Sequence, residues 1–262
     1  MTQDEAAAVN IGIAGLSGRM GHLLAQEVAV AGACLVGGIN RSGDNAPAGV
    51  ALLADIAALA GAADVVIEFA HPGTVIAHAA AIAAAGRAWV LGTTGLSAAD
   101  EAAVAAAARR VPVVYAANFS PGVTLVLALA EKLAAALPAC EYDAEIVEMH
   151  HRQKVDAPSG TAIGIGRAVA AGRGVALEDV RDGARDGRVG PRRPGAIGFA
   201  ALRGGQVVGE HTLLFASATE HISLNHRAFD RRVFASGAVR AALWACGRPP
   251  GLYSMMDVLG MA

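Results

Sequence analysis

Strand-like runs alternate with helix-like runs over the first 118 residues, and this alternation constrains the fold more than any other feature of the 262-residue chain. The strand-like runs are short and almost wholly apolar, and they cover residues 9–14, 34–39, 64–70, 89–91 and 111–115. The helix-like runs cover residues 19–30, 75–85 and 98–109. Strands without a polar face are typical of a parallel sheet that helices cover on both sides. The sequence therefore predicts an α/β domain that binds its ligand at the carboxyl ends of the strands.

From residue 120 the pattern changes and predicts a second domain of different construction. A helix is expected over residues 123–137 and a strand over residues 144–149. The alternating runs at 197–202, 206–215 and 221–226 predict an antiparallel sheet with a hairpin turn at residues 203–205.

The last residues look helical again, over 233–243 and 253–259, and we expect them to return to the first domain. The predicted division is therefore a dinucleotide-binding domain of residues 1–119 and 231–262, and a second domain of residues 120–230.

Composition excludes several classes of function. The formal net charge is −2, so no basic surface for nucleic acid is expected. The N-terminus has no charged-then-apolar targeting segment, and no uninterrupted run of 18 apolar residues predicts a membrane span. The three cysteines are far apart and form no CxxC pair, which suits a reducing compartment. We therefore expect a cytoplasmic protein that binds neither nucleic acid nor a membrane.

A glycine-rich loop, Gly15-Leu16-Ser17-Gly18-Arg19-Met20-Gly21, follows the first strand and opens a helix. Glycines at such a turn allow the backbone to approach a pyrophosphate and the helix to pack closely on the strand. The spacing is G-x-x-G-x-x-G rather than the stricter G-x-G-x-x-G, so an ordinary glycine turn is the alternative. The position at the first strand end favours a dinucleotide site.

Asn40 and Arg41 end the second strand, where an NAD site usually has an acidic residue for the ribose hydroxyls. Arginine at this place suits the 2′-phosphate of NADPH, and a solvated loop arginine is the alternative. Arg19 is a second candidate for the same phosphate or for stacking on adenine. The sequence predicts that NADPH is used at least as well as NADH.

The segment from Glu148 to Thr161 reads Glu-Met-His-His-Arg-Gln-Lys-Val-Asp-Ala-Pro-Ser-Gly-Thr and is the densest in chemistry. Its Lys154 is one of only two lysines, against 19 arginines, although chance placement is the alternative. An ammonium can release its proton when desolvated, whereas a guanidinium cannot. Two adjacent histidines in an extended segment face opposite sides, so His150 and His151 should differ in role. A metal site with Glu148, or plain packing, is the alternative for this pair.

With these motifs the chain closely resembles the 4-hydroxy-tetrahydrodipicolinate reductase family, formerly called dihydrodipicolinate reductases. The resemblance covers the whole length and extends to Gly92-Thr93-Thr94-Gly95, Ala116-Ala117-Asn118-Phe119-Ser120 and Gly209-Glu210-His211-Thr212. It implies a Rossmann-like domain, a substrate domain with a mixed sheet and a homotetramer. It also implies reduction of a cyclic, unsaturated dicarboxylate by NADPH or NADH.

The resemblance implies roles for individual residues. His150 and Lys154 match proton donors, and His151, Gly160 and Thr161 match substrate-binding positions. The matching cofactor positions are Gly15, Leu16, Ser17, Gly18, Arg19, Met20, Gly92, Thr93, Thr94, Ala116, Ala117, Asn118 and Phe119.

Two departures affect the cofactor site, because Asn40 stands where an acidic residue is common and His71 where a relative has arginine. Two other functions compete with the reductase. Another two-domain dehydrogenase would keep the glycine loop without the segment from Lys154 to Thr161. A non-catalytic NAD(P)H-sensing protein would need neither His150 nor Lys154.

Overall fold

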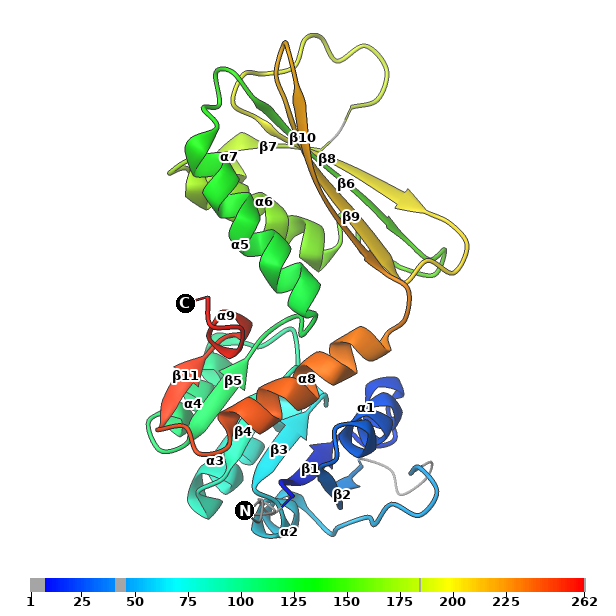
Figure 1. Cartoon of the computed structure of the whole chain (residues 1–262), viewed down its shortest axis with the longest axis vertical. Coiled ribbons are helices and arrows are strands. Elements are labelled where there is room, and N and C mark those ends of the chain that lie inside the picture. Colours follow the sequence, from blue (N-terminus) through cyan, green and yellow to red (C-terminus); the bar gives the residue numbers. More distant parts are fainter. Residues whose placement is uncertain (1–7, 41–45, 184, 262) are drawn as a thin grey trace, which may run out of the picture. The chain divides into compact units, whose positions relative to one another are not determined.

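The computed structural model describes residues 8–40, 46–183 and 185–261. The chain forms two compact units (Figure 1). Unit 1 comprises Met1–Pro121 together with Arg231–Ala262, and unit 2 comprises Gly122–Asp230.

Unit 1 is built around a six-stranded sheet in the order β11-β5-β4-β3-β1-β2. Every neighbouring pair in it is parallel. The strands are β1 (Asn10–Ala14), β2 (Cys34–Ile39), β3 (Val65–Glu68), β4 (Ala88–Leu91), β5 (Pro112–Tyr115) and β11 (Gly251–Tyr253). The parallel sheet predicted from the apolar runs is therefore confirmed.

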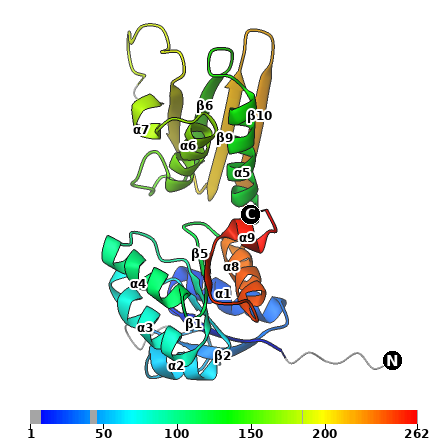
Figure 2. The ribbon, with the colours of Figure 1, turned by 90° about the vertical axis from the view of Figure 1, so that its left-hand side faces the viewer.

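Helices cover both faces of this sheet, with α1 and α8 on one side and α2, α3 and α4 on the other (Figure 2). Their bounds are α1 (Arg19–Val30), α2 (Ile56–Ala62), α3 (Val75–Ala85), α4 (Ala98–Ala108) and α8 (Arg232–Ala245), with the short η1 (Pro72–Thr74) and α9 (Met255–Val258). Strand side chains alternate between the two cores: Ile13 and Ile67 face α1 and α8, whereas Val66 and Trp89 face the other three helices. Burial on both faces explains why these strands carry no polar alternation.

The predicted helix over residues 253–259 is wrong in its first part. Gly251–Tyr253 is a strand that pairs with β5, and the helix α9 begins only at Met255. A capping box sets this start, because Ser254 accepts from the Met256 backbone and Asp257 accepts from the backbone and hydroxyl of Ser254.

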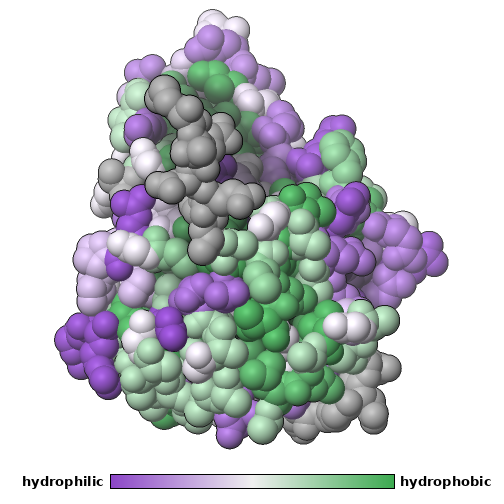
Figure 3. Space-filling model, turned by 60° about the horizontal axis from the view of Figure 1, so that its bottom comes forward, coloured by the Kyte–Doolittle hydropathy of each residue, from purple (hydrophilic) through white to green (hydrophobic). Residues whose placement is uncertain are grey.

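Alanine-rich helices leave much of the exposed surface weakly apolar. On the face drawn in Figure 3, pale green surface is broad and purple hydrophilic side chains are scattered across it. Alanines of α3 and α4 line a groove together with Ile76 of α3 and with Arg110, which follows α4. In the described ranges no helix is both long and apolar enough to cross a membrane.

Unit 2 has a five-stranded mixed sheet in the order β10-β9-β6-β8-β7. Strand β9 is antiparallel to β10 and β6, whereas β8 is parallel to β6 and β7. The strands are β6 (Asp143–His150), β7 (Arg181–Asp182), β8 (Ile197–Arg203), β9 (Gly209–Ala216) and β10 (His221–Ala228). The helices are α5 (Pro121–Ala136), α6 (Gly160–Gly172) and α7 (Leu177–Val180). All three pack on one face of the sheet through a core that includes Val126, Ile165, Leu177 and Phe215.

The predicted hairpin at residues 203–205 is wrong, because β6 lies between β8 and β9. The connection instead crosses the end of β6, where the Gly204 backbone N–H donates to the His150 carbonyl. The His151 N–H donates in turn to the carbonyl of Val207. Strand β8 therefore runs parallel to β6, and only β9 and β10 form the expected antiparallel pair. This pairing is set by β6, far away in sequence, so local turn residues could not reveal it.

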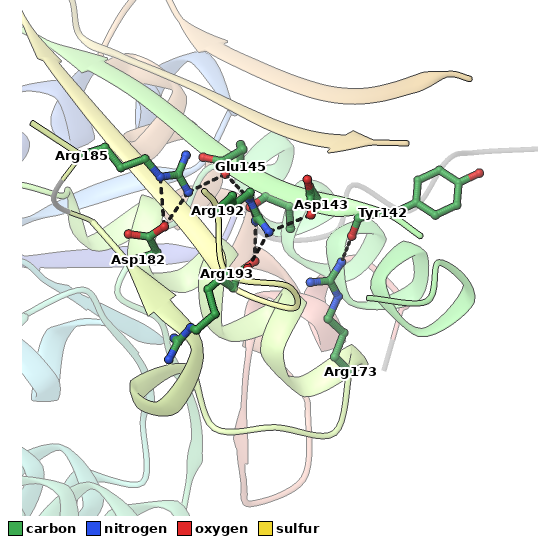
Figure 4. Close-up of polar contacts among 10 residues, drawn as sticks. Tyr142, Asp143, Glu145, Arg173, Asp182, Arg185, Arg192 and Arg193 are labelled. Carbon is green, nitrogen blue, oxygen red and sulfur yellow. Dashed lines mark hydrogen bonds and ion pairs between the residues drawn. The ribbon is translucent and has the colours of Figure 1, made fainter. Parts of the chain in front are cut away.

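A network of arginines lies at the start of β6 (Figure 4). Arg185 and Arg192 each donate to Glu145 Oε1 at 2.8 Å. Arg192 also donates to Asp143 Oδ1 at 2.8 Å, and Arg185 to Asp182 Oδ2 at 2.7 Å. These ion pairs fasten the segment between β7 and β8 to the first residues of β6.

Candidate active site

The glycine loop of unit 1 follows β1 and leads into α1. Gly15 has φ +92°, and a Cβ there would overlap the carbonyl oxygen of Phe69. A Cβ at Gly21 would overlap the Leu16 carbonyl. Gly18 is the extended residue before α1, which carries no acidic side chain in its first turn. The loop therefore needs glycine where the backbone comes closest, and the start of α1 is suited to an anion.

A cavity of about 380 Å³ lies beside this loop in unit 1. It is lined by Gly18, Arg19, Met20, Phe69, Ala70, His71, Pro72, Gly92, Thr93, Thr94 and Arg231. Six residues expected at the cofactor site therefore line one cavity, three of them after β1 and three after β4. The sequence reasoning missed Phe69, Ala70, Pro72 and Arg231, although the segment after β3 belongs to the same row of strand ends.

Two polar contacts connect neighbouring strand ends around the cavity. The Asn40 side-chain oxygen accepts the Ser17 backbone N–H at 2.8 Å, which joins the end of β2 to the glycine loop. The Ala70 N–H donates to Thr93 Oγ1 at 3.2 Å, which joins the ends of β3 and β4. Arg41 lies outside the described residues.

Other residues expected at the cofactor site do not present a side chain to the cavity. The Leu16 side chain is fully buried in the core, so only its backbone can face a ligand. Ala116, Ala117, Asn118 and Phe119 follow β5 and are not among the residues that line the cavity. The Asn118 side-chain oxygen accepts the Ser120 N–H at 2.8 Å, and the Phe119 ring packs 5.6 Å from that of Phe69.

In unit 2, His150 ends β6 and is buried over the carboxylate of Glu148. Its Nδ1 lies 2.6 Å from Glu148 Oε2. Burial lowers the pKa of His150, and the hydrogen bond and charge of Glu148 offset only part of this shift. Burial alone would raise the pKa of Glu148, but hydrogen bonds from Arg203, His150 and the Ser159 backbone outweigh it and keep that carboxyl ionised.

The segment after β6 carries Lys154 and leads to α6. The Lys154 ammonium lies 2.8 Å from Asp156 Oδ1, and this ion pair lowers the pKa of Asp156. Ser159 caps the helix by accepting the Ala162 N–H at 3.2 Å. Gly160 and Thr161 thus occupy the first turn of α6, the positive end of the helix dipole, which favours an anion.

His211 on β9 adds a third imidazole beside His150. The two rings meet edge to face with centroids 5.2 Å apart, and His211 Nε2 lies 3.1 Å from Ser159 Oγ. Burial lowers the pKa of His211 to about 4, so it is neutral at pH 7. Within the part of the chain that the structure describes, no group of three His, Cys, Asp or Glu side chains is arranged to hold a metal ion. Glu148, the third ligand of the alternative metal site, is instead paired with Arg203.

Two family models match the chain. The model described as "Dihydrodipicolinate reductase, N-terminus" matches residues 9–119. The model described as "Dihydrodipicolinate reductase, C-terminus" matches residues 122–259.

Curated relatives match over almost the whole length. A 4-hydroxy-tetrahydrodipicolinate reductase from Granulibacter bethesdensis is 68% identical over 256 residues, which cover 97% of this chain and 98% of the relative. A 4-hydroxy-tetrahydrodipicolinate reductase from Gluconacetobacter diazotrophicus is 62% identical over 253 residues, which cover 97% of this chain and 98% of the relative.

Solved structures share the fold. A dipicolinate-bound dihydrodipicolinate reductase from Paenisporosarcina sp. TG-14 is 23% identical, with a TM-score of 0.78 over 95% of this chain and 98% of the other. GenD2 from gentamicin A biosynthesis, in complex with NAD, is 14% identical, with a TM-score of 0.63 over 100% of this chain and 93% of the other.

Proposed function

Because this chain belongs to the dihydrodipicolinate reductase family, we propose that His150 and Lys154 supply the proton in that family's reaction. The chain is an NAD(P)H-dependent enzyme that reduces 4-hydroxy-tetrahydrodipicolinate in the synthesis of diaminopimelate and lysine. The observation that carries the proposal is the placing of His150 over the buried carboxylate of Glu148. The match to this family of reductases decides against a sensing protein and an unrelated dehydrogenase.

The cofactor supplies a hydride when it is bound, and the strand ends of unit 1 fit it. Glycines at positions 15 and 21 are required by close backbone approach, and the first turn of α1 suits a phosphate. Asn40 Nδ2 is buried and has no hydrogen-bond partner among the described residues, so it can donate to the cofactor. The proposed cofactor residues are Gly15, Leu16, Ser17, Gly18, Arg19, Met20, Asn40, Arg41, Gly92, Thr93, Thr94, Ala116, Ala117, Asn118 and Phe119.

The substrate carries two carboxylates, and unit 2 offers several groups that attract them. His151, Gly160 and Thr161 are the proposed substrate-binding residues. The first turn of α6 presents backbone N–H groups, and Lys154 adds a positive charge in the preceding segment. Hydride transfer leaves the substrate electron-rich, so a positioned acid must deliver a proton. Both His150 and Lys154 can carry such a proton.

Substitution of the two proton donors tests this assignment. His150→Ala and Lys154→Ala should each lower kcat by about 10²–10⁴, the usual loss for a general acid. Lys154→Arg should lower kcat as well, because a guanidinium holds its proton too tightly to donate it. Lys132→Ala is the matched control, since Lys132 is the only other lysine and lies exposed on α5. Wild-type kcat in a folded Lys154→Ala enzyme would exclude the proposed role.

We also propose that the enzyme is a cytoplasmic homotetramer that assembles through the sheet of unit 2. Among the described residues, helices cover only one face of this sheet (Figure 1). The other face exposes apolar side chains, including Val147 at 38% and Leu202 at 51%. Leu202→Asp should produce smaller species in sedimentation velocity, whereas Val30→Asp, on the exposed side of α1, should not. Unchanged sedimentation of the first variant would exclude this face as the interface.

A further inference from the structure

Glu148 is a buried carboxylate whose hydrogen-bonding capacity is filled. It is 1% exposed, and Arg203 donates to its two oxygens at 2.8 Å each. The Ser159 backbone N–H donates at 3.1 Å, and His150 Nδ1 lies at 2.6 Å. We infer that Glu148 and Arg203 are positioning residues for the reduction, which fix the tautomer of His150 and hold the segment that carries Lys154. This inference rests on the proposed roles of His150 and Lys154.

The charge of Glu148 decides which nitrogen of His150 carries the proton. An ionised carboxylate can only accept hydrogen bonds, so His150 Nδ1 must donate to it. Nε2 is then the nitrogen that gains and loses the catalytic proton. Space is kept beside Nε2 by Gly209, where a Cβ would lie 3.0 Å from this nitrogen.

Arg203 connects the two proposed proton donors. Its Nη2 donates to Glu148 Oε1 and also to the carbonyl oxygen of Asp156 at 2.6 Å. The side chain of Asp156 holds the Lys154 ammonium. One guanidinium therefore contacts both the carboxylate under His150 and the backbone of the Lys154 segment. Lysine has a single ammonium and cannot reproduce this planar arrangement of donors.

Burial is the main cause of the lowered pKa of His150, and the charged groups around the ring modify this shift. Glu148 on β6 raises its pKa, whereas Lys154 and Arg203 on β8 lower it, and the neutral His211 faces it from β9. Replacing the charge of Glu148 by an amide removes the favourable partner and lowers the pKa of His150 further. If protonated His150 is the acid, the limb on which kcat falls with rising pH should move to lower pH.

Glu148→Gln is the direct test in the full-length enzyme with NADPH. We expect kcat to fall by about 10²-fold or more, with the KM for NADPH changed less than about twofold. The falling limb of the pH profile should move to lower pH. In ¹⁵N NMR of histidine-labelled enzyme, the wild type should show His150 protonated at Nδ1, and the variant should lose this preference. Wild-type kcat and an unchanged His150 signal would overturn the inference.

Arg203→Lys is the second variant and keeps the positive charge if Glu148→Gln does not fold. Loss of one charge-assisted hydrogen bond should lower kcat about tenfold. Glu145→Gln is the matched control, because Glu145 is a β6 glutamate that two arginines bind (Figure 4). The alternating burial along β6 places Glu145 on the face opposite to Glu148. It should keep wild-type kcat. An equal loss of kcat in Glu145→Gln and Glu148→Gln would mean that general weakening of β6, not positioning, causes the effect.

A double variant separates this inference from the proposed function. If Glu148 acts through His150, Glu148→Gln should lower kcat little further in the His150→Gln background. Additive losses would overturn the positioning role. Wild-type kcat in His150→Gln alone would instead overturn the proposed function. Loss of kcat in His150→Gln with none in Glu148→Gln would overturn only the inference.

Discussion

The carboxamide oxygen of Asn40 accepts the backbone N–H of Ser17 at 2.8 Å, while the amide nitrogen of Asn40 is buried without a partner among the described residues. The side chain that follows β2 thus has its acceptor on the glycine loop and an unsatisfied amide donor among the described residues. An aspartate in the same orientation would keep the first contact and place a negative oxygen where the donor now lies.

This orientation predicts the effect of Asn40→Asp on cofactor choice. A donor suits the 2′-phosphate of NADPH, whereas a carboxylate repels it and accepts from the ribose hydroxyls of NADH. We expect the wild type to use NADPH at least as well as NADH, and Asn40→Asp to lower kcat/KM for NADPH by about tenfold or more, the cost of losing a charged hydrogen bond. Asn40→Ala, which loses the contact with Ser17, should lower kcat/KM for both NADPH and NADH. A wild-type preference for NADH that Asn40→Asp leaves unchanged would contradict this prediction.

Pyridine-2,6-dicarboxylate should compete with the substrate, because it carries two carboxylates and cannot accept a hydride productively. The dipicolinate-bound relative shares the fold of this chain. His151→Ala combined with Thr161→Val should raise its inhibition constant without changing the KM for NADPH. Steady-state inhibition measures both quantities. Inhibition that survives the double substitution unaltered would place the ligand away from α6.

Gly237 on α8 should not tolerate a side chain. A Cβ there would overlap the carbonyl oxygen of Phe119, so Gly237→Ala forces the helix and the segment after β5 apart. Overpacking of this kind typically costs about 1–3 kcal/mol of unfolding free energy. Gly61→Ala on α2 is the control, because nothing lies within 4 Å of a Cβ at that position. Urea unfolding should show Gly237→Ala destabilised and Gly61→Ala unchanged or slightly more stable.

His211 should make unit 2 sensitive to acid. Its folded pKa of about 4 lies below the ordinary histidine value of 6.5, so the unfolded chain binds the proton more strongly. The stabilisation is complete above pH 6.5 and is lost as the pH falls toward 4, by an amount on the order of 3 kcal/mol. His211→Gln should therefore reduce the loss of stability between pH 7 and pH 4.5 in urea unfolding. His221→Gln, exposed on β10, should behave as the wild type; equal pH dependence in all three proteins would refute the prediction.

Local sequence was sufficient for the parts of the fold that depend on neighbouring residues. The apolar strands of unit 1, the glycine loop before α1 and the start of α6 at Gly160 are each encoded within a few residues. The mixed sheet of unit 2 depends instead on β6, which separates β8 from β9. Alternation of apolar residues marks a strand but does not name its partner, so the hairpin at residues 203–205 was predicted wrongly.

The residues of the candidate site also fall into two groups, those that one local segment contains and those that only the fold brings together. His150, Lys154 and Thr161 lie in one segment with a recognisable spacing. Arg203 is 55 residues from Glu148, and only the parallel register that opposes His150 to Arg203 brings the guanidinium to the carboxylate. The sequence holds 19 arginines, and nothing local distinguishes this one. The contact between Arg203 and Glu148 depends on long-range strand pairing, and the sequence therefore could not predict it.

The interruption of unit 1 by unit 2 determines the order in which a growing chain can fold. One core of unit 1 packs Ile13 and Phe119 against Ala238 and Val239 of α8. A ribosome delivers α8 only after all of unit 2, so these apolar side chains stay uncovered while the continuous segment of unit 2 is already complete. Such long-range closure slows folding and leaves intermediates prone to aggregation. The enzyme thus depends on α8, which follows unit 2 in the chain, to cover the first strands that it makes.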